Sequence, residues 1–192
     1  MKAIILLATL KNKEQSNTAT LVEFVGNYLA ENNINFEVIK LLDYTIHPGT
    51  CTYMETEDDW PVIYQKILEA EILIFATPIW WNTHSSVLQR IMERLIEVYD
   101  RIEEGGISPF EGKIGGLIIT GDADGVENIT DNLANFFLTM GITMPPYTSL
   151  GVLWDGHAKG SGKTKEDLLQ YYNDVYSGYA KKMADYLLSV KR

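Results

Sequence analysis

Residues 72–86 read ILIFATPIWWNTHSS, and this stretch decides the fold class. Its first five residues are all apolar, without the alternation that a half-exposed strand shows, and they have the length of a strand buried on both faces. The polar and aromatic loop that follows leads into residues 87–96, where apolar side chains recur at spacings of three and four. A buried strand followed by an amphipathic helix is the repeating unit of a parallel sheet covered by helices.

The same unit recurs along the whole chain. Apolar runs lie at 3–8, 36–42, 72–76, 114–119 and 147–154, and helical patterns separate them. A last pattern over 165–190 predicts a long closing helix. Five strands alternating with five helices predict an α/β fold with one parallel sheet and helices on both faces. The 192 residues show no repeat and no linker, so we expect a single domain over 1–192.

The composition excludes several classes of protein. Asp and Glu total 26 against 16 Lys and Arg, which gives a formal net charge of −10, so we expect no nucleic acid partner. The one cysteine, Cys51, permits no internal disulfide and no cysteine-held iron–sulfur cluster, and we expect the cytoplasm as its setting. No apolar run approaches the roughly 20 residues that span a membrane, so we expect no membrane partner.

Three loops at the carboxyl ends of predicted strands are candidate ligand sites, because ligands of such sheets bind there. The first loop, residues 9–18, runs into a helix whose first turn offers Ser16 and Asn17. Free N–H groups at the helix start, the nearby hydroxyls and the charge of Lys11 suit a phosphate. Ordinary capping of the helix explains the same residues, and Glu14 works against an anion. Both interpretations stay open on this loop alone.

The second loop, residues 77–86, contains the adjacent pair Trp80 and Trp81. Two neighbouring tryptophans at a strand end cannot both point into one core, and such a loop offers a flat wall to a planar aromatic ligand. The alternative places one Trp in the core and the other at a subunit contact. We expect His84 to begin the following helix rather than to act as a ligand or a base.

The third loop, residues 120–128, contains glycines that permit close approach of the backbone to a ligand. Its acidic residues, Asp122, Asp124 and Glu127, favour a capped turn over a calcium site, because the glycine and glutamate of an EF-hand loop are not matched. We therefore expect no metal. Residues 160–164, GSGKT, imitate a phosphate loop, but the preceding glycine is misplaced by one residue, which favours a solvated loop.

The sequence shows no set of side chains suited to nucleophilic catalysis. Cys51 lies far from any glycine elbow, and the three histidines fall in loops or at a helix start. We expect no catalytic side chain. A site that combines a phosphate-binding loop with an aromatic wall is typical of proteins in which a cofactor carries the reaction.

Taken together, the three loops resemble those of the flavodoxin-like NADPH-dependent FMN reductase family. The matching stretches are Thr9-Leu10-Lys11 with Ser16-Asn17-Thr18, then Thr77-Pro78-Ile79-Trp80-Trp81 with Ser85-Ser86, and then Thr120 to Gly125. Residues 141–156 resemble the family's final strand region, and Asn82 stands where glycine is common. The resemblance implies a flavodoxin-like three-layer sandwich with strand order 2-1-3-4-5.

The resemblance also implies an FMN site and a reduced nicotinamide, NADPH or NADH, as the transient hydride donor. It assigns the FMN phosphate to Thr9, Lys11, Ser16, Asn17 and Thr18. It assigns the edge of the isoalloxazine ring to Pro78, Ile79, Trp80, Trp81 and Asn82. It assigns the opposite side of the site to Thr120, Gly121, Asp122 and Gly125.

These implications lead to one hypothesis and two rivals. The leading hypothesis is an FMN-dependent NAD(P)H oxidoreductase that transfers hydride to a quinone, a flavin or a similar small-molecule acceptor, as a homodimer or higher homo-oligomer. The first rival is a flavodoxin-type electron carrier without nicotinamide oxidase activity, which an acidic surface suits. The second is a regulatory relative that has lost flavin binding, and Glu14 is its support.

Overall fold

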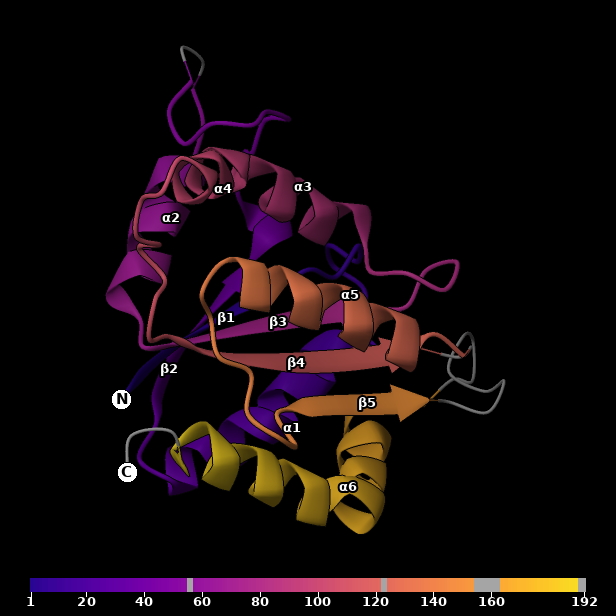
Figure 1. Cartoon of the computed structure of the whole chain (residues 1–192). Helices are drawn as coiled ribbons and strands as arrows, with labels where there is room; N and C mark the ends of the chain where they lie inside the picture. The colour runs from indigo at the N-terminus through magenta and orange to yellow at the C-terminus, as the bar shows by residue number, and fades with distance from the viewer. Residues whose placement is uncertain (55–56, 122–123, 154–162, 190–192) are drawn as a thin grey trace.

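The fold is a five-stranded parallel sheet between two layers of helices (Figure 1). A computed structural model describes residues 1–54, 57–121, 124–153 and 163–189. The strand order is β2-β1-β3-β4-β5, as the resemblance implies. The strands are β1 (Lys2–Leu7), β2 (Asn35–Lys40), β3 (Ile72–Pro78), β4 (Ile114–Gly121) and β5 (Ser149–Leu153). The α/β prediction and the flavodoxin-like order are therefore confirmed.

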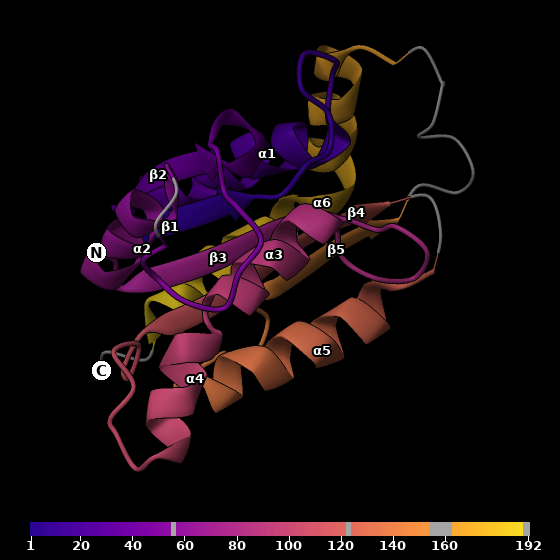
Figure 2. The same ribbon diagram turned by 90° about the horizontal axis from the view of Figure 1, so that it is seen from above.

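One group of helices covers each face of the sheet, as Figures 1 and 2 show. The first group is α1 (Asn17–Glu31) and α6 (Lys165–Leu187). The second group is α2 (Trp60–Glu69), α3 (Ser86–Arg94), α4 (Ile96–Glu103) and α5 (Val126–Thr139), and a short 3-10 helix spans Leu41–Asp43. Each layer buries its own apolar cluster against the sheet. None of the helices in the described ranges is long and apolar enough to cross a membrane.

The two edge strands correct the prediction that all five apolar runs are buried on both faces. The inner strands β1, β3 and β4 are almost wholly buried, whereas β2 buries only Ile39 fully and β5 alternates between buried and partly exposed residues. Val38 in β2 is exposed, and Glu37 and Lys40 flank it with charges. An edge strand has a neighbour on one side only, and charged residues there keep it from pairing with another chain.

The single helix expected over residues 87–96 is in fact two helices. The backbone leaves the helical path at Leu95, and α4 begins at Ile96 in a new direction. The break places Arg94 at the end of α3 and Glu97 in the first turn of α4. Both side chains bind the long segment between β2 and α2: Glu97 accepts from the Thr52 N–H at 2.6 Å.

Arg94 is the anchor of that segment. Its side chain is completely buried and pairs with the carboxylate of Asp58, which is only 2% exposed. Its guanidinium donates to the backbone oxygens of His47, Cys51 and Thr52 at 3.0, 2.8 and 3.1 Å. A buried charge is tolerated when it is paired and fully hydrogen-bonded, and this arginine satisfies both conditions. The loop between β2 and α2 is thus fixed to the end of α3.

We expect Arg94→Met to destabilise the protein by about 3–5 kcal/mol, because Asp58 and three carbonyl oxygens then stay buried without their donor. The matched control is Arg101→Gln, which breaks the exposed ion pair of Arg101 with Glu97. That change is expected to alter stability by less than about 1 kcal/mol. Urea unfolding of both variants measures the difference, and equal losses would contradict the role of Arg94.

Asp58 makes the folded state sensitive to acid. Burial raises the pKa of its carboxyl, but the hydrogen bond from the Trp60 N–H at 3.0 Å and the pairing with Arg94 outweigh burial and lower the pKa below its ordinary value. Because the folded pKa is depressed, this stabilisation is fully present above the unfolded pKa and is lost as the pH falls through the folded one.

We therefore expect the free energy of unfolding to decline as the pH falls below about 5, and to decline less in Asp58→Asn, which lacks the ionised carboxylate. Urea titrations at about pH 6 and about pH 3 measure both slopes. Parallel declines in the two proteins would show that other groups control the acid response.

Candidate functional site

The loop after β1 is shaped by hydroxyl contacts before any ligand is considered. The hydroxyls of Thr9 and Ser16 lie 2.8 Å apart, and Thr9 Oγ1 also accepts from the Lys11 N–H at 3.2 Å. Ser16 caps α1 by accepting from the Ala19 N–H. These contacts draw the two ends of the loop together, so the chain turns directly from β1 into α1.

The start of α1 keeps two donors for a ligand. The Ser16 hydroxyl accepts from the Ala19 N–H. No group in the described part of the chain accepts from the N–H of Asn17 or Thr18. Lys11 lies on the same loop, with its Nζ 2.9 Å from the Gln15 carbonyl oxygen, so a cation stands beside these donors. Free N–H groups at a helix N-terminus together with a lysine form an anion site. Glu14 is exposed and does not line the cleft.

The loop after β3 is tied to the loop after β1 by Ser85. Its hydroxyl donates to the Ala8 carbonyl oxygen at 2.7 Å, and its N–H donates to Thr77 Oγ1 at 3.0 Å. The same residue caps α3. Because Ser85 is completely buried, these bonds are shielded from water and hold the two loops in one fixed relation.

Between Thr77 and Ser85 the chain makes a two-residue turn. Trp80 and Thr83 exchange backbone hydrogen bonds of 2.8 and 2.9 Å, and the two central residues, Trp81 and Asn82, have φ angles of 50° and 63°. Positive φ at both positions is typical of a type I′ turn. Asparagine tolerates this conformation, which accounts for Asn82 where glycine is common. Asn128 in α5 donates to the Asn82 carbonyl oxygen at 2.7 Å and secures the turn.

The end of β4 supplies the third side of the site. The Ile79 N–H donates to the Thr120 carbonyl oxygen at 2.9 Å, so the loop after β3 follows β4 for one residue beyond the strand. A Cβ at Gly121 would lie 2.7 Å from that of Ile79, so only glycine permits this approach. The hydroxyl of Thr120 is buried and has no hydrogen-bond partner within the described residues.

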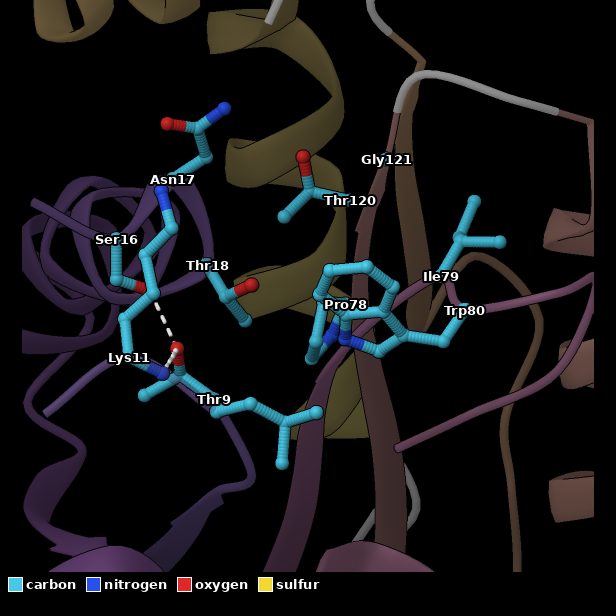
Figure 3. Close-up of a pocket in the computed structure, with 11 residues that line it drawn as sticks. Thr9, Lys11, Ser16, Asn17, Thr18, Pro78, Ile79, Trp80, Thr120 and Gly121 are labelled. Carbon is cyan, nitrogen blue, oxygen red and sulfur yellow. Dashed lines mark hydrogen bonds between the residues drawn. The ribbon is translucent and has the colours of Figure 1, made fainter. Parts of the chain in front are cut away.

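These three loops enclose one cleft at the carboxyl ends of the strands (Figure 3). Ten residues that the sequence analysis assigned to a cofactor line it together: Thr9, Lys11, Ser16, Asn17, Thr18, Pro78, Ile79, Trp80, Thr120 and Gly121. Figure 3 shows Thr18 and Thr120 on opposite sides of the space between the loops. Leu10 lines the cleft too; it lies in a stretch that carries the resemblance, but no role was assigned to its apolar side chain.

Three of the other assigned residues lie elsewhere. Trp81 is turned outward and is 97% exposed, and Trp80 is 37% exposed, so the alternative that places one of the two tryptophans in the core is wrong. Asn82 forms the turn, and Gly125 precedes α5 with a φ of 156°, close behind Asn82. Neither lines the cleft. Asp122 lies outside the described residues, as does most of the 160–164 loop; Thr164 caps α6.

His84 begins α3 from the position before the cap, as expected. Its Nε2 lies 2.9 Å from Gln89 Oε1, and Gln89 is the fourth residue of the helix. Apolar residues at these two positions often form a hydrophobic staple, and here a hydrogen bond takes its place. The other ring nitrogen, Nδ1, is buried and has no hydrogen-bond partner within the described ranges.

Residues 1–153 match the family model described as NADPH-dependent FMN reductase. The chain belongs to this family. The resemblance that the loops carry is therefore confirmed, and the family implies FMN as the cofactor and NAD(P)H as the hydride donor.

Three similar proteins place this FMN reductase family member among its relatives. It is 32% identical over 163 residues to the divalent metal cation transporter MntH of Mycobacterium bovis, covering 82% of this chain and 24% of that protein. It is 28% identical over 172 residues to the 8-demethyl-8-aminoriboflavin-5'-phosphate synthase of Streptomyces davaonensis, covering 84% and 66%. The chain thus spans less than two thirds of either relative's length.

The third is the crystal structure of RosB with bound 8-demethyl-8-formylriboflavin-5'-phosphate. It superposes with a TM-score of 0.76 at 22% identity, covering 99% of this chain and 78% of that one. This likeness supports the flavodoxin-like fold.

The residues of the cleft fit FMN. A phosphate monoester matches the free N–H groups of Asn17 and Thr18 and the charge of Lys11. A planar ring matches the wall that Pro78 and Trp80 form. The clearest sign of a missing ligand is Thr120, because a buried hydroxyl without a partner costs about 1–3 kcal/mol and a bound molecule can supply the partner.

We expect Thr120→Val to weaken FMN binding about fivefold, the equivalent of one hydrogen bond, while leaving the FMN-free protein equally or more stable. The control is Thr148→Val, because the buried Thr148 hydroxyl donates to the Pro145 carbonyl oxygen at 2.7 Å. That change should cost about 1 kcal/mol of stability and leave FMN affinity unchanged. Fluorescence titration and thermal unfolding separate the two effects, and a destabilised Thr120→Val would show that its hydroxyl has a structural role.

Proposed function

We propose that this protein is an FMN-dependent reductase that takes hydride from NADPH or NADH and reduces a quinone, a flavin or a similar small molecule. The observation that supports it most strongly is the single cleft formed by three loops, with an anion site at one end and an indole wall at the other. When bound, FMN supplies the redox chemistry of the site, accepting hydride and passing the electrons on. The protein side chains bind and orient the FMN and tune its electrostatic environment.

The assigned residues divide this work by chemistry. Thr9, Lys11, Ser16, Asn17 and Thr18 hold the phosphate through hydroxyls, backbone N–H groups and one cation. On the opposite side, Pro78, Ile79 and Trp80 hold the ring edge beside a turn that is already rigid, while Thr120 and Gly121 close the site. Preorganised groups of this kind lower the cost of ordering the site on binding.

Two other functions differ from this proposal in how the protein would bind FMN and how the flavin would be reduced. A formal net charge of −10 favours the electron carrier, since acidic surfaces suit docking to basic protein partners. The name of the Streptomyces davaonensis relative favours a role in which the flavin is a substrate rather than a resident cofactor. We further propose a cytoplasmic homodimer or higher homo-oligomer that acts on small molecules without nucleic acid or membrane partners.

The first experiment is an absorbance spectrum of the protein loaded with FMN and desalted, followed by anaerobic addition of NADPH or NADH. We expect retained bands near about 370 and 450 nm and their loss on reduction by the nicotinamide, because hydride reaches the flavin directly. A retained flavin that no nicotinamide reduces, with one-electron steps in a redox titration, would support the carrier. FMN that is released after desalting would support its use as a substrate.

A further inference from the structure

Helix α6 lies beside α1 on one face of the sheet (Figure 1), and a side chain of α6 reaches the first turn of α1, where the anion site begins. The completely buried Tyr172 donates its hydroxyl hydrogen to the Asn17 carbonyl oxygen at 3.3 Å. The ion pair of Lys165 with Glu23 also joins the two helices, but both of its side chains are about half exposed. Water weakens such an exposed pair, so the buried tyrosine makes the contact that can act on the site.

The ring and the hydroxyl of Tyr172 contribute differently. The ring packs against Phe24 of α1, with ring centroids 5.7 Å apart, and both residues belong to the apolar cluster between these helices and the sheet. A phenylalanine would fill the same space without the cost of burying a polar group. What the hydroxyl adds is therefore the bond to Asn17.

The Asn17 carbonyl and the Thr18 N–H belong to one peptide group. A trans peptide is planar, and its C=O and N–H point in opposite directions. Tyr172 thus holds one end of this group. The other end, the Thr18 N–H, has no acceptor in the described part of the chain, and Thr18 lines the cleft.

A hydrogen bond to a carbonyl oxygen also affects the N–H of the same peptide group. It draws electron density toward the oxygen and makes the N–H a stronger donor, by roughly 10–30% for each bond in a chain. The effect is mutual, because an anion bound to the N–H makes the oxygen a better acceptor. Hydroxyl donors usually lie about 2.7–2.8 Å from their acceptors, so the 3.3 Å bond of Tyr172 can shorten when an anion binds.

We propose that Tyr172 is a positioning residue for the FMN phosphate: its hydroxyl holds and polarises the peptide group whose N–H, that of Thr18, binds the phosphate. This inference rests on the proposed function, in which FMN occupies the cleft, and adds a residue from α6, a helix that contributes nothing to the lining of the cleft. Tyr172 does not touch FMN. Its effect is specific to the phosphate, so it favours FMN over riboflavin, which has the same ring system and no phosphate.

The test compares the wild type with Tyr172→Phe, which removes the hydroxyl and keeps the ring against Phe24. Fluorescence titrations give the dissociation constants of FMN and of riboflavin for both proteins. We expect FMN to bind the variant about threefold more weakly and the riboflavin affinity to stay within about 1.5-fold, because only FMN carries the charged acceptor. In the FMN complex, the Thr18 amide proton of the variant should resonate at higher field, as a weaker hydrogen bond requires.

The matched control is Tyr28→Phe. Tyr28 packs against the same Phe24 ring, with centroids 5.3 Å apart, but it lies about three helical turns from Asn17. We expect this change to leave both flavin affinities and the Thr18 amide resonance unaltered.

Two results overturn the positioning role. Equal weakening of FMN and riboflavin in Tyr172→Phe would mean that the hydroxyl supports the whole cleft, and an unchanged FMN affinity would mean that it does not act on the phosphate. If the wild type binds neither flavin, the proposed function fails, and inorganic phosphate then serves as the probe, followed at the Thr18 amide. About threefold weaker phosphate binding in the variant supports the role, whereas equal affinity or an unresponsive Thr18 amide overturns it.

Discussion

The parallel pairing of β1 with β3 is the constraint on which the site depends. Leu7 and Ala76 are partners in the register, and the Ala8 N–H extends the pairing with a 2.8 Å bond to the Ala76 carbonyl oxygen. The loops after β1 and β3 therefore leave the sheet side by side. The strand order changes direction at this point, because β2 and β3 lie on opposite sides of β1. The buried Ser85 hydroxyl closes the gap between them. A shift of one residue in this register would send the apolar side chains of each strand to the opposite face of the sheet.

The buried polar side chains fall into two groups, those whose hydrogen bonds are satisfied within the protein and those with an atom that has no partner in the described chain. Arg94 is completely buried, yet the loop between β2 and α2 satisfies its guanidinium with three carbonyl oxygens and a carboxylate. In the described chain, the buried side-chain atoms without a partner are Trp60 Nε1, His84 Nδ1 and Thr120 Oγ1. Trp60 lies in the core, whereas Thr120 lines the cleft and His84 lines the pocket beside it. The satisfied groups hold the scaffold, and two of the three unsatisfied atoms belong to residues that line cavities.

The elements and the loops of the cleft were predictable because they depend on local patterns. Continuous apolar runs predicted the inner strands, and the hydroxyls of Thr9 and Ser16 beside a helix start predicted the first loop as one wall of the cleft. Three features escaped because they depend on the tertiary arrangement. The exposure of Val38 follows from its position in an edge strand, and the sequence around Arg94 does not indicate the distant partners that bury it. The outward direction of Trp81 follows from a turn that Asn128, 46 residues away, secures.

The distribution of charge explains how an acidic protein can bind an anionic cofactor. A formal net charge of −10 repels anions at long range, but salt screens that repulsion within about 10 Å, and the short-range contacts at the start of α1 then decide binding. The neighbouring pocket, which shares Trp80 with the cleft and extends to Gln89, is lined by no charged residue. Desolvating an uncharged ring there costs little, while desolvating an anion costs much.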